Sequence, residues 1–582
     1  MKIVIEILKN HTGIHYAIIF MVTLIMAVPA IDWQVTETHD GHVHILRLIG
    51  TNIALANTDF PHLVIPYFCN DFGYSMNLFY GILVTYPPLL LKAFPISYVG
   101  ALKIFAVATI FFSGIAMYRC ILEITKKKEI SLVASLLYMT AVYRFEDIYT
   151  RFAMGEFAAF VFLPMILQAL HNILNEDGKK AWLLGLGVTA LVLTHSITTV
   201  YFAIFCLIYV LLHGKKLWRK QVWGKFIAQI GIVLVLTAFY TIPMFEHKMA
   251  TEYCIFTPKV MKTHGAWAAK HTVEPLKFLN DKQYPLEGND IRMEIGIPML
   301  TLLVLGIFVR KKIPANIKDI WVISLMLSAV SLFMCTEYFP WRYLPDFLCT
   351  IQYPWRMNTF FILFASIACS INLYYFVSMW KKDWIKNIIS GIAIAGILAN
   401  TVYYTSFYQW EDTTLDKQYE ERRLHNLTFS HMAINRDYLP LRALILQDSY
   451  LKEREDRVYV LKGDATITNE EKEGLHLEFT LQNGTRGTIL ELPYFYYLGY
   501  QVTVQTEQAE YKIQTNESKN GFVQVILPED IDEAKVIVHY TGTALEKASY
   551  GISAVGCILI AGYAIMKRSK QENAQKLERK NN

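Results

Sequence analysis

The sequence contains little charge for its length. Of 582 residues, only 18% are Asp, Glu, Lys or Arg, whereas 54% are hydrophobic, and the mean hydropathy is +0.29. Soluble domains carry about 25% charged residues. The shortage excludes an ordinary soluble enzyme and indicates a polytopic membrane protein. The net charge of +5 gives no basis for nucleic-acid binding, because the basic residues lie mostly in short loops.

Metal-binding and cleavage motifs are also missing. Eight cysteines are present, but no CxxC pair or Cys/His spacing is typical of a zinc site. Cys335 and Cys349 fall on predicted outer segments, where either a disulfide or two free thiols is compatible with the sequence. No small-x-small cleavage site follows the apolar run in residues 1–31, so we interpret it as a retained first span.

Apolar runs of membrane-spanning length recur along the chain. About 20 apolar residues cross the ~30 Å hydrocarbon core of a bilayer. The expected fold class is an α-helical polytopic membrane protein with about 12 transmembrane helices. The twelve predicted spans are residues 14–30, 98–122, 129–145, 155–174, 181–195, 197–213, 226–245, 293–309, 319–335, 355–379, 385–406 and 549–566.

The basic loops predict the orientation, because Lys and Arg are enriched in cytoplasmic loops. With twelve spans, both termini are cytoplasmic and the protein lies in the plasma membrane. The count depends on Tyr74–Phe94, which is apolar but contains Tyr86-Pro87-Pro88. We interpret this segment as a re-entrant or interfacial helix within a first outer loop, residues 31–97. The clusters on the predicted cytoplasmic side are Lys126–Lys128, Lys179–Lys180, Lys215, Lys216, Arg219, Lys220, Arg310–Lys312, Lys381–Lys382 and Lys567, Arg568 and Lys570.

A polar region separates the bundle of residues 1–407 from a final helix at 547–567 and a tail at 568–582. Within this region, residues 408–546, the stretch Leu475–Leu481 alternates apolar and polar residues, as a half-buried strand does. Similar short stretches follow at turn-bounded intervals, which predicts an extracytoplasmic β-sandwich over about 457–541. The aromatic run Tyr494–Tyr497 could pack in its core, rest on the membrane or stack on a sugar.

Asp40 is the first candidate catalytic residue. It lies in the outer loop, just before Gly41 and a predicted amphipathic helix over residues 42–56 that could lie along the membrane interface. Asp40 is either the helix cap or a carboxylate that acts as a general base or metal ligand. His39, His42 and His44 nearby are either interfacial hydrogen-bonding residues or metal ligands. We take His42 and His44 as candidate substrate-binding residues.

Two charged candidates follow in the next outer loop. Arg151 and Glu156 come after the acidic pair Glu146-Asp147. Glu156 opens a span, where a helix N-terminus favours its charge, so its role could be structural. Arg151 could instead bind a phosphate, and several charges on one outer face favour a site.

Further candidates are His195, Arg342 and Arg356. His195 lies at a turn between two spans, where a structural role is the alternative. Arg342 and Arg356 flank an aromatic outer loop, and Pro354 can begin a helix that carries Arg356 one turn inside. Each arginine either snorkels to the interface or helps to clamp a phosphate, because guanidinium groups match phosphate oxygens.

Several stretches resemble a bacterial membrane family labelled 6-pyruvoyl-tetrahydropterin-synthase-related and the related YfhO-type proteins. The label does not imply pterin chemistry, because a soluble pterin synthase has no polytopic bundle. The matching residues are the first outer loop, Phe72-Gly73-Tyr74 with Phe79-Tyr80-Gly81, Arg151 with Gly155-Glu156, Gln352–Arg356, Asp437–Pro440, and Leu492-Pro493-Tyr494 with Gly499-Tyr500.

Both groups resemble the glycosyltransferase C superfamily. The resemblance implies an acidic residue in the first outer loop, matched by Asp40, and a polyprenyl-phosphate sugar donor. No Asp-x-Asp stands there. We therefore expect an inverting transferase acting on an envelope polymer, lipid or protein, with no certain cofactor and a divalent metal as the alternative. The other functions considered are a lipid or polysaccharide transporter or flippase, and a non-catalytic envelope-assembly protein.

Overall fold

The computed structural model describes residues 12–57, 63–281, 291–408, 414–425, 436–444 and 453–581. The chain divides into two compact units. The helical unit comprises residues 1–56, 80–225 and 257–427, and the sheet unit comprises residues 57–79, 226–256 and 428–582. Each unit is described by itself.

The protein is a membrane protein by the length and composition of its helices. Among the residues that the structure describes, seven helices are long and apolar enough to cross a bilayer. Five shorter apolar helices of 10–17 residues accompany them, so the twelve-span count and the orientation remain predictions. The seven are Tyr98–Thr125, Met154–Asn175, Lys220–Ala250, Ala315–Cys335, Pro354–Ser378, Asp383–Tyr408 and Ala544–Met566; the shorter ones are Thr12–Met26, Ile82–Ala93, Trp182–Val192, Ser196–Leu212 and Ile297–Val309.

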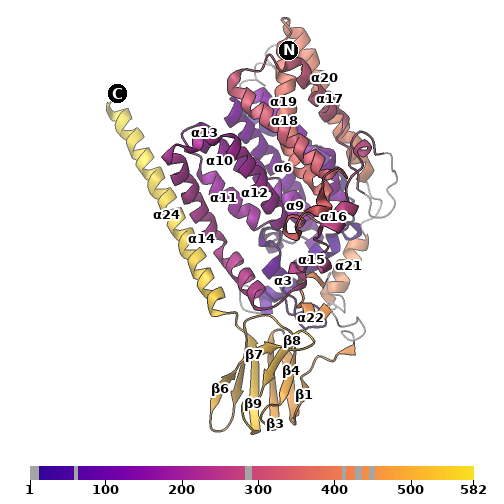
Figure 1. The fold of residues 1–582 in the computed structure, drawn as a ribbon, viewed down its shortest axis with the longest axis vertical. Coiled ribbons are helices and arrows are strands. Elements are labelled where there is room, and N and C mark those ends of the chain that lie inside the picture. The colour runs from indigo at the N-terminus through magenta and orange to yellow at the C-terminus, as the bar shows by residue number, and fades with distance from the viewer. Residues whose placement is uncertain are drawn as a thin grey trace. The chain divides into compact units, whose positions relative to one another are not determined.

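Closely packed helices form the helical unit (Figure 1). Apolar residues are buried along several faces of α7 and α19, as expected for helices inside a bundle. The main elements are α2 (Thr12–Met26), α3 (Gly41–Asn57), α6 (Tyr98–Thr125), α7 (Lys128–Met139), α10 (Phe162–Asn175), α11 (Trp182–Val192), α12 (Ser196–Leu212), α17 (Ile297–Val309), α18 (Ala315–Cys335), α19 (Asn358–Ser378), α20 (Asp383–Thr405) and α21 (Thr414–His425).

The structure corrects what the sequence predicted for three segments. The predicted span 129–145 is interrupted after Met139. The Thr140 hydroxyl donates a hydrogen bond to the Leu136 carbonyl (2.7 Å), and side-chain bonds of this kind compete with the hydrogen bonds of a helix backbone. The segment Tyr74–Phe94 is not one helix but four short helical pieces, because Pro87 and Pro88 start a new one. The predicted helix at 42–56 is confirmed as α3, but protein covers it on nearly all sides from Val43 to Thr51.

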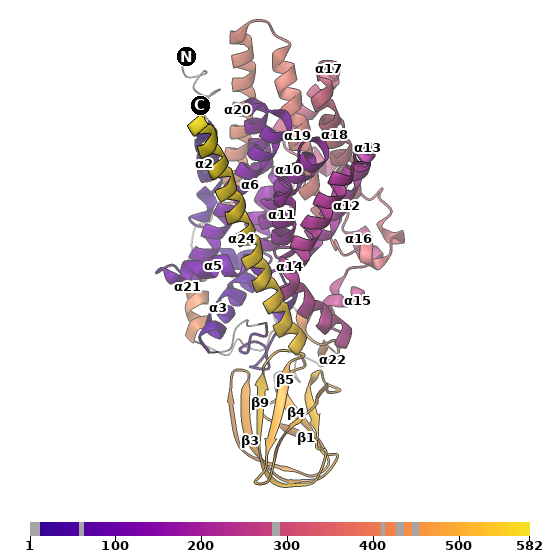
Figure 2. The ribbon, with the colours of Figure 1, turned by 90° about the vertical axis from the view of Figure 1, so that its left-hand side faces the viewer.

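Two antiparallel sheets make up most of the sheet unit, and Figure 2 shows their strands. The sheets pack together through stacked rings of Tyr494 and Tyr500, whose centroids are 5.0 Å apart. Tyr494, Phe495 and Tyr497 are buried, so this aromatic run packs in the core. The orders are β1-β4-β8-β7 and β2-β3-β9-β5-β6, with β1 (Tyr459–Lys462), β2 (Thr466–Glu473), β3 (His476–Gly484), β4 (Ile489–Phe495), β5 (Tyr500–Gln505), β6 (Glu510–Ile513), β7 (Thr515–Glu517), β8 (Phe522–Ile526) and β9 (Ile531–Tyr540).

Two long helices complete the sheet unit. They are α24 (Ala544–Asn581), which follows β9, and the part of α14 (Lys220–Ala250) beyond residue 225. The Ser553 hydroxyl of α24 donates to the Val235 carbonyl of α14 (2.8 Å). In the helical unit, Cys335 and Cys349 are separate buried thiols, so the disulfide alternative is not realised.

Candidate functional site

A buried arginine, Arg151, forms the centre of a polar cluster in the helical unit. Its Nη1 donates to Asp147 Oδ1 (2.8 Å), Glu156 Oε2 (2.9 Å) and the Tyr143 hydroxyl (2.9 Å). The Trp355 ring covers the guanidinium at 4.5 Å. Only 4% of the Arg151 side chain is exposed. A buried charge needs such compensation because desolvating it is costly.

Glu156 links this cluster to the second predicted arginine. Arg356 Nε lies 3.5 Å from Glu156 Oε2, and Arg356 Nη1 donates to the Ile351 carbonyl (2.9 Å) and Gln352 Oε1 (3.0 Å). The Tyr143 and Thr359 hydroxyls both donate to Glu156 Oε1, at 2.6 and 3.1 Å. Glu156 therefore holds Arg151 and Arg356 side by side.

Asp40 reaches this cluster through its backbone. Its amide donates to the Arg151 carbonyl (2.9 Å), and the His39 amide donates to the Thr150 carbonyl (3.1 Å). The Asp40 side chain is half-buried, and its carboxylate has no hydrogen-bond or ion-pair partner among the residues that the structure describes. It makes no side-chain cap for α3, so the capping interpretation loses support. Burial raises the pKa of Asp40, while Arg151 and Arg356 oppose this rise.

A short helix fixes the loop before Asp40. Asp416 of α21 accepts hydrogen bonds from the amides of Val35 (3.0 Å) and Thr36 (3.1 Å) and from the Thr36 hydroxyl (2.7 Å). The loop is tight, because a Cβ at Gly41 would lie 1.7 Å from the Val35 carbonyl oxygen. Glycine is therefore required for the turn that presents Asp40.

Unusual backbone surrounds both site arginines. Glu146–Thr150 is a π-helix (η5), a rare element found frequently at functional sites. Phe152 follows Arg151 with φ +52°, and Gln352 precedes Arg356 with φ +61°. Bulky residues adopt this left-handed conformation only where their surroundings enforce it, and such strain clusters at functional sites.

The predicted histidines border the same cluster. His44 is buried, with its ring centroid 5.7 Å from that of Tyr80, and burial lowers its pKa to about 3, so it is neutral. His42 lies in the first turn of α3, where its charge acts on Asp40. His195 caps the N-terminus of α12, and its ring accepts a hydrogen bond from the Thr198 amide (3.4 Å), which supports its structural interpretation. It also lies against Gly155, where a Cβ would approach its ring to 2.8 Å.

Arg342 is not part of the cluster. Its side chain is exposed in η8 (Trp341–Tyr343) and has no hydrogen bond or ion pair within the described ranges. The structure instead adds Asp147, whose spacing of four residues from Arg151 is the helical ion-pair spacing. Burial and the charge of Glu156 raise the pKa of Asp147 well above its usual range, against the effect of Arg151.

A metal site is not formed by these groups. Over the described residues, no set of three or more His, Cys, Asp and Glu side chains is placed to hold a metal ion. The carboxylates of Asp147 and Glu156 bind arginines instead. The residues present therefore do not fit the metal-ligand alternative for His39, His42 and His44.

Comparisons with known proteins give weak similarities. No family model matches the chain. An uncharacterized protein of Lactococcus lactis subsp. cremoris (strain MG1363) is 22% identical over an alignment of 588 positions, and the alignment covers 90% of each chain. None of these results supports the resemblance to the YfhO-type or pterin-synthase-related proteins.

Two solved structures from Archaeoglobus fulgidus are also similar. The apo oligosaccharyltransferase matches with a TM-score of 0.40 and 10% identity over 73% of this chain. The oligosaccharyltransferase AglB, in complex with an inhibitory peptide and a dolichol-phosphate, matches with a TM-score of 0.38 and 12% identity over 73% of this chain. The matched region spans 61% of each archaeal chain. Similarity at this level is too weak to transfer an activity.

Proposed function

We propose that this protein transfers a sugar from a polyprenyl-phosphate donor to a cell-envelope acceptor on the extracytoplasmic face of the membrane. The observation that carries the proposal is the Asp40 carboxylate, which has no partner in the described structure and lies beside two arginines that share Glu156. A general base and a phosphate-binding pair are the two elements that such a transfer needs.

A third guanidinium group, that of Arg144, lies near the two site arginines. The guanidinium groups of Arg144, Arg151 and Arg356 all lie close enough to act on the Asp147 carboxyl group. Arg144 is fully buried, and its Nε and Nη2 make no hydrogen bond in the described structure. A phosphodiester carries one negative charge, and its oxygens accept hydrogen bonds from guanidinium N–H groups of this kind.

The reaction assigns each group one task. The acceptor hydroxyl oxygen attacks the anomeric carbon from the face opposite the phosphate, and Asp40 takes the hydroxyl proton. The bond between the anomeric carbon and the phosphate oxygen breaks, and its electron pair leaves with the polyprenyl phosphate. Arg151 and Arg356 stabilise the additional charge on that phosphate. The anomeric configuration is inverted.

The helices that carry the cluster suit a donor with an apolar tail. The seven long apolar helices supply a membrane environment, and the site helices Met154–Asn175 and Pro354–Ser378 are among them. A lipid-linked substrate can therefore reach the cluster along the bilayer, with its phosphate near the ends of these helices. We include the predicted twelve-span topology and the outer position of residues 408–546 in this proposal.

Two measurements test the function. Glycan and lipid analysis of cell envelopes with and without the protein should show the loss of one sugar decoration. Purified protein in liposomes should then release polyprenyl phosphate from the matching donor and glycosylate the envelope acceptor, whereas the Asp40→Asn variant should not. An unchanged sugar profile with a lipid or polymer retained on one side of the membrane would instead support the transporter.

A further inference from the structure

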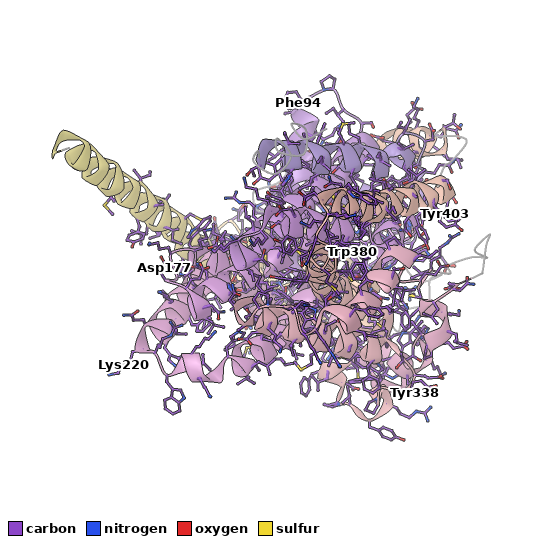
Figure 3. All side chains as sticks on the ribbon, turned by 90° about the horizontal axis from the view of Figure 1, so that it is seen from above. Phe94, Asp177, Lys220, Tyr338, Trp380 and Tyr403 are labelled. Carbon is purple, nitrogen blue, oxygen red and sulfur yellow. The ribbon has the colours of Figure 1, made fainter. Side chains whose placement is uncertain are left out.

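The helical unit carries a basic corner that the proposed transfer does not use. We define this corner as residues 176–182 and 212–225, where the end of α10, the starts of α11 and α14, and the end of α12 come together. Residues 176–225 contain seven basic and two acidic side chains, and this excess equals the +5 of the whole chain. Asp177 and Lys220 lie toward the same edge of the unit (Figure 3). Such a concentration of positive charge attracts an anionic surface.

Tryptophans are exposed at the same place. Trp218, Trp223 and Trp182 are 88%, 53% and 52% exposed, and the neighbouring Leu211 and Leu212 are also exposed. Indole rings favour the level of lipid headgroups, where their apolar faces and their N–H groups are both accommodated. The corner therefore combines an apolar anchor with positive charge.

Hydrogen bonds hold the corner in shape. Arg219 donates to the Leu174 carbonyl at the end of α10, and Lys216 donates to Asn175 Oδ1. Lys225 Nζ donates to the Asp177 carbonyl (2.5 Å), and Trp223 Nε1 donates to the Leu217 carbonyl (2.9 Å). These contacts occupy part of the basic side chains but leave Lys215 and Lys220 exposed, without a hydrogen bond or ion pair in the described structure.

We infer that this corner binds the headgroups of anionic phospholipids. Lys215 and Lys220 contact the lipid phosphate, and Trp218 rests between the headgroup and the upper part of the acyl chains. The inference does not depend on the proposed sugar transfer, because none of these residues belongs to the cluster around Arg151.

Native mass spectrometry of the full-length protein tests the inference. The protein in neutral detergent is titrated with dioleoyl phosphatidylglycerol or with dioleoyl phosphatidylcholine. Phosphatidylglycerol should bind more tightly, and Lys215→Gln/Lys220→Gln should weaken its binding by about 25-fold, roughly fivefold for each lysine. Trp218→Ala should weaken the binding of both lipids. Unchanged lipid binding in Trp218→Ala would overturn the role of the indole.

A matched control removes two exposed lysines elsewhere in the same unit. Lys259→Gln/Lys270→Gln changes the net charge equally, and should leave phosphatidylglycerol binding unchanged. Equal losses in the two double variants, or no loss in the first, would overturn the assignment. Displacement of the lipid by sn-glycerol 3-phosphate at equal concentration would also overturn it, because the corner would then recognise a soluble phosphate.

Discussion

Each unit contains a buried arginine surrounded by aromatic rings, and the two differ in how their carboxylates are satisfied. In the sheet unit, Arg454 Nη2 lies 3.2 Å from Glu491 Oε1, and its guanidinium lies 4.2 Å from the Phe522 ring centroid. Asn520 donates to the other Glu491 oxygen (3.2 Å), so both oxygens are occupied.

The carboxylates around Arg151 are not all occupied. Asp147 Oδ2 is buried without a hydrogen bond in the described structure, and the Asp40 carboxylate makes none. In the sheet unit, Arg454 Nε lacks a hydrogen bond in the described structure, but both oxygens of its carboxylate partner are occupied. Unsatisfied buried carboxylate oxygens require a separate explanation. The comparison indicates that Arg454 is structural and that the Arg151 cluster is prepared for a ligand and a proton.

The largest expected effect is on catalysis. Asp40→Asn should lower transfer at least about 100-fold, because the amide cannot take a proton. The melting temperature should be nearly unchanged, since no side-chain hydrogen bond is lost. Initial rates and a melting curve measure both. Asp32→Asn, an exposed carboxylate in the same loop, is the control and should retain activity. Near-normal turnover of Asp40→Asn would exclude the general base.

A loss of stability should follow from Arg454→Met. The change leaves Glu491 as an unpaired buried charge and should cost about 3–5 kcal/mol of unfolding free energy. Denaturant unfolding of the purified protein measures it, and transfer per folded molecule should stay unchanged. The double variant Arg454→Met/Glu491→Leu should recover most of the loss. Reduced transfer at full stability would assign Arg454 to function instead.

A pH dependence of stability should arise from Glu146. Burial raises its pKa from 4.5 to about 7, against hydrogen bonds from Thr150 and Tyr408 and the charge of Arg292. Because the folded state favours the protonated form, its stabilisation is complete below pH 4.5 and is lost as pH rises through 7. Buried His44 titrates in the opposite sense, so the Glu146 contribution is the difference between the native protein and Glu146→Gln. This difference in unfolding free energy should fall by roughly 3 kcal/mol over the range.

Thermal unfolding at a series of pH values measures this dependence. Glu146→Gln should remove the Glu146 contribution from the profile, because the amide does not titrate. Glu37→Gln, which changes an exposed acid, should leave the profile as it is in the native protein. A difference between the native protein and Glu146→Gln that rises between pH 5 and 7 would contradict the sign derived from the Glu146 pKa.

A smaller effect on donor use should follow from Arg356→Lys. Lysine keeps the charge but loses the planar guanidinium, so the KM for donor should rise about tenfold. Donor titration and a melting curve are compared, with Arg342→Lys as the exposed control that should change neither. Unchanged donor affinity with a lowered melting temperature would leave Arg356 as the structural partner of Glu156.

The smallest effect should come from Asp416→Asn. Asp416 acts as a positioning residue, because it holds Val35 and Thr36 before Asp40. We expect a kcat reduced a few-fold with an unchanged donor KM, and a stability loss of about 1 kcal/mol. Steady-state kinetics separate the two constants. Glu421→Gln, an exposed acid on α21, should have no effect. An equal fall in stability without a change in kcat would limit Asp416 to a structural role.

Part of the candidate site is local in the sequence. Asp40 precedes a helix start, and Arg151 and Glu156 lie close together, so the sequence could nominate all three. The sequence could not decide whether the arginines bind a substrate phosphate or only a carboxylate of the protein. Glu156 contacts Thr359 across 203 residues, and Asp416 contacts Val35 across 381 residues. No local pattern predicts such pairs, because they depend on how distant helices pack.

The sequence by itself determined the membrane class, helix α3 and the strand-rich segment, because these follow from apolar length and short-range periodicity. Only the tertiary structure decided that α3 is buried, that Arg342 lies apart and that Glu156 joins two arginines. Burial and pairing are set by the free energy of desolvating charges within a particular packing of helices. That free energy depends on all the neighbours of a residue in space, and few of them are its neighbours in the chain.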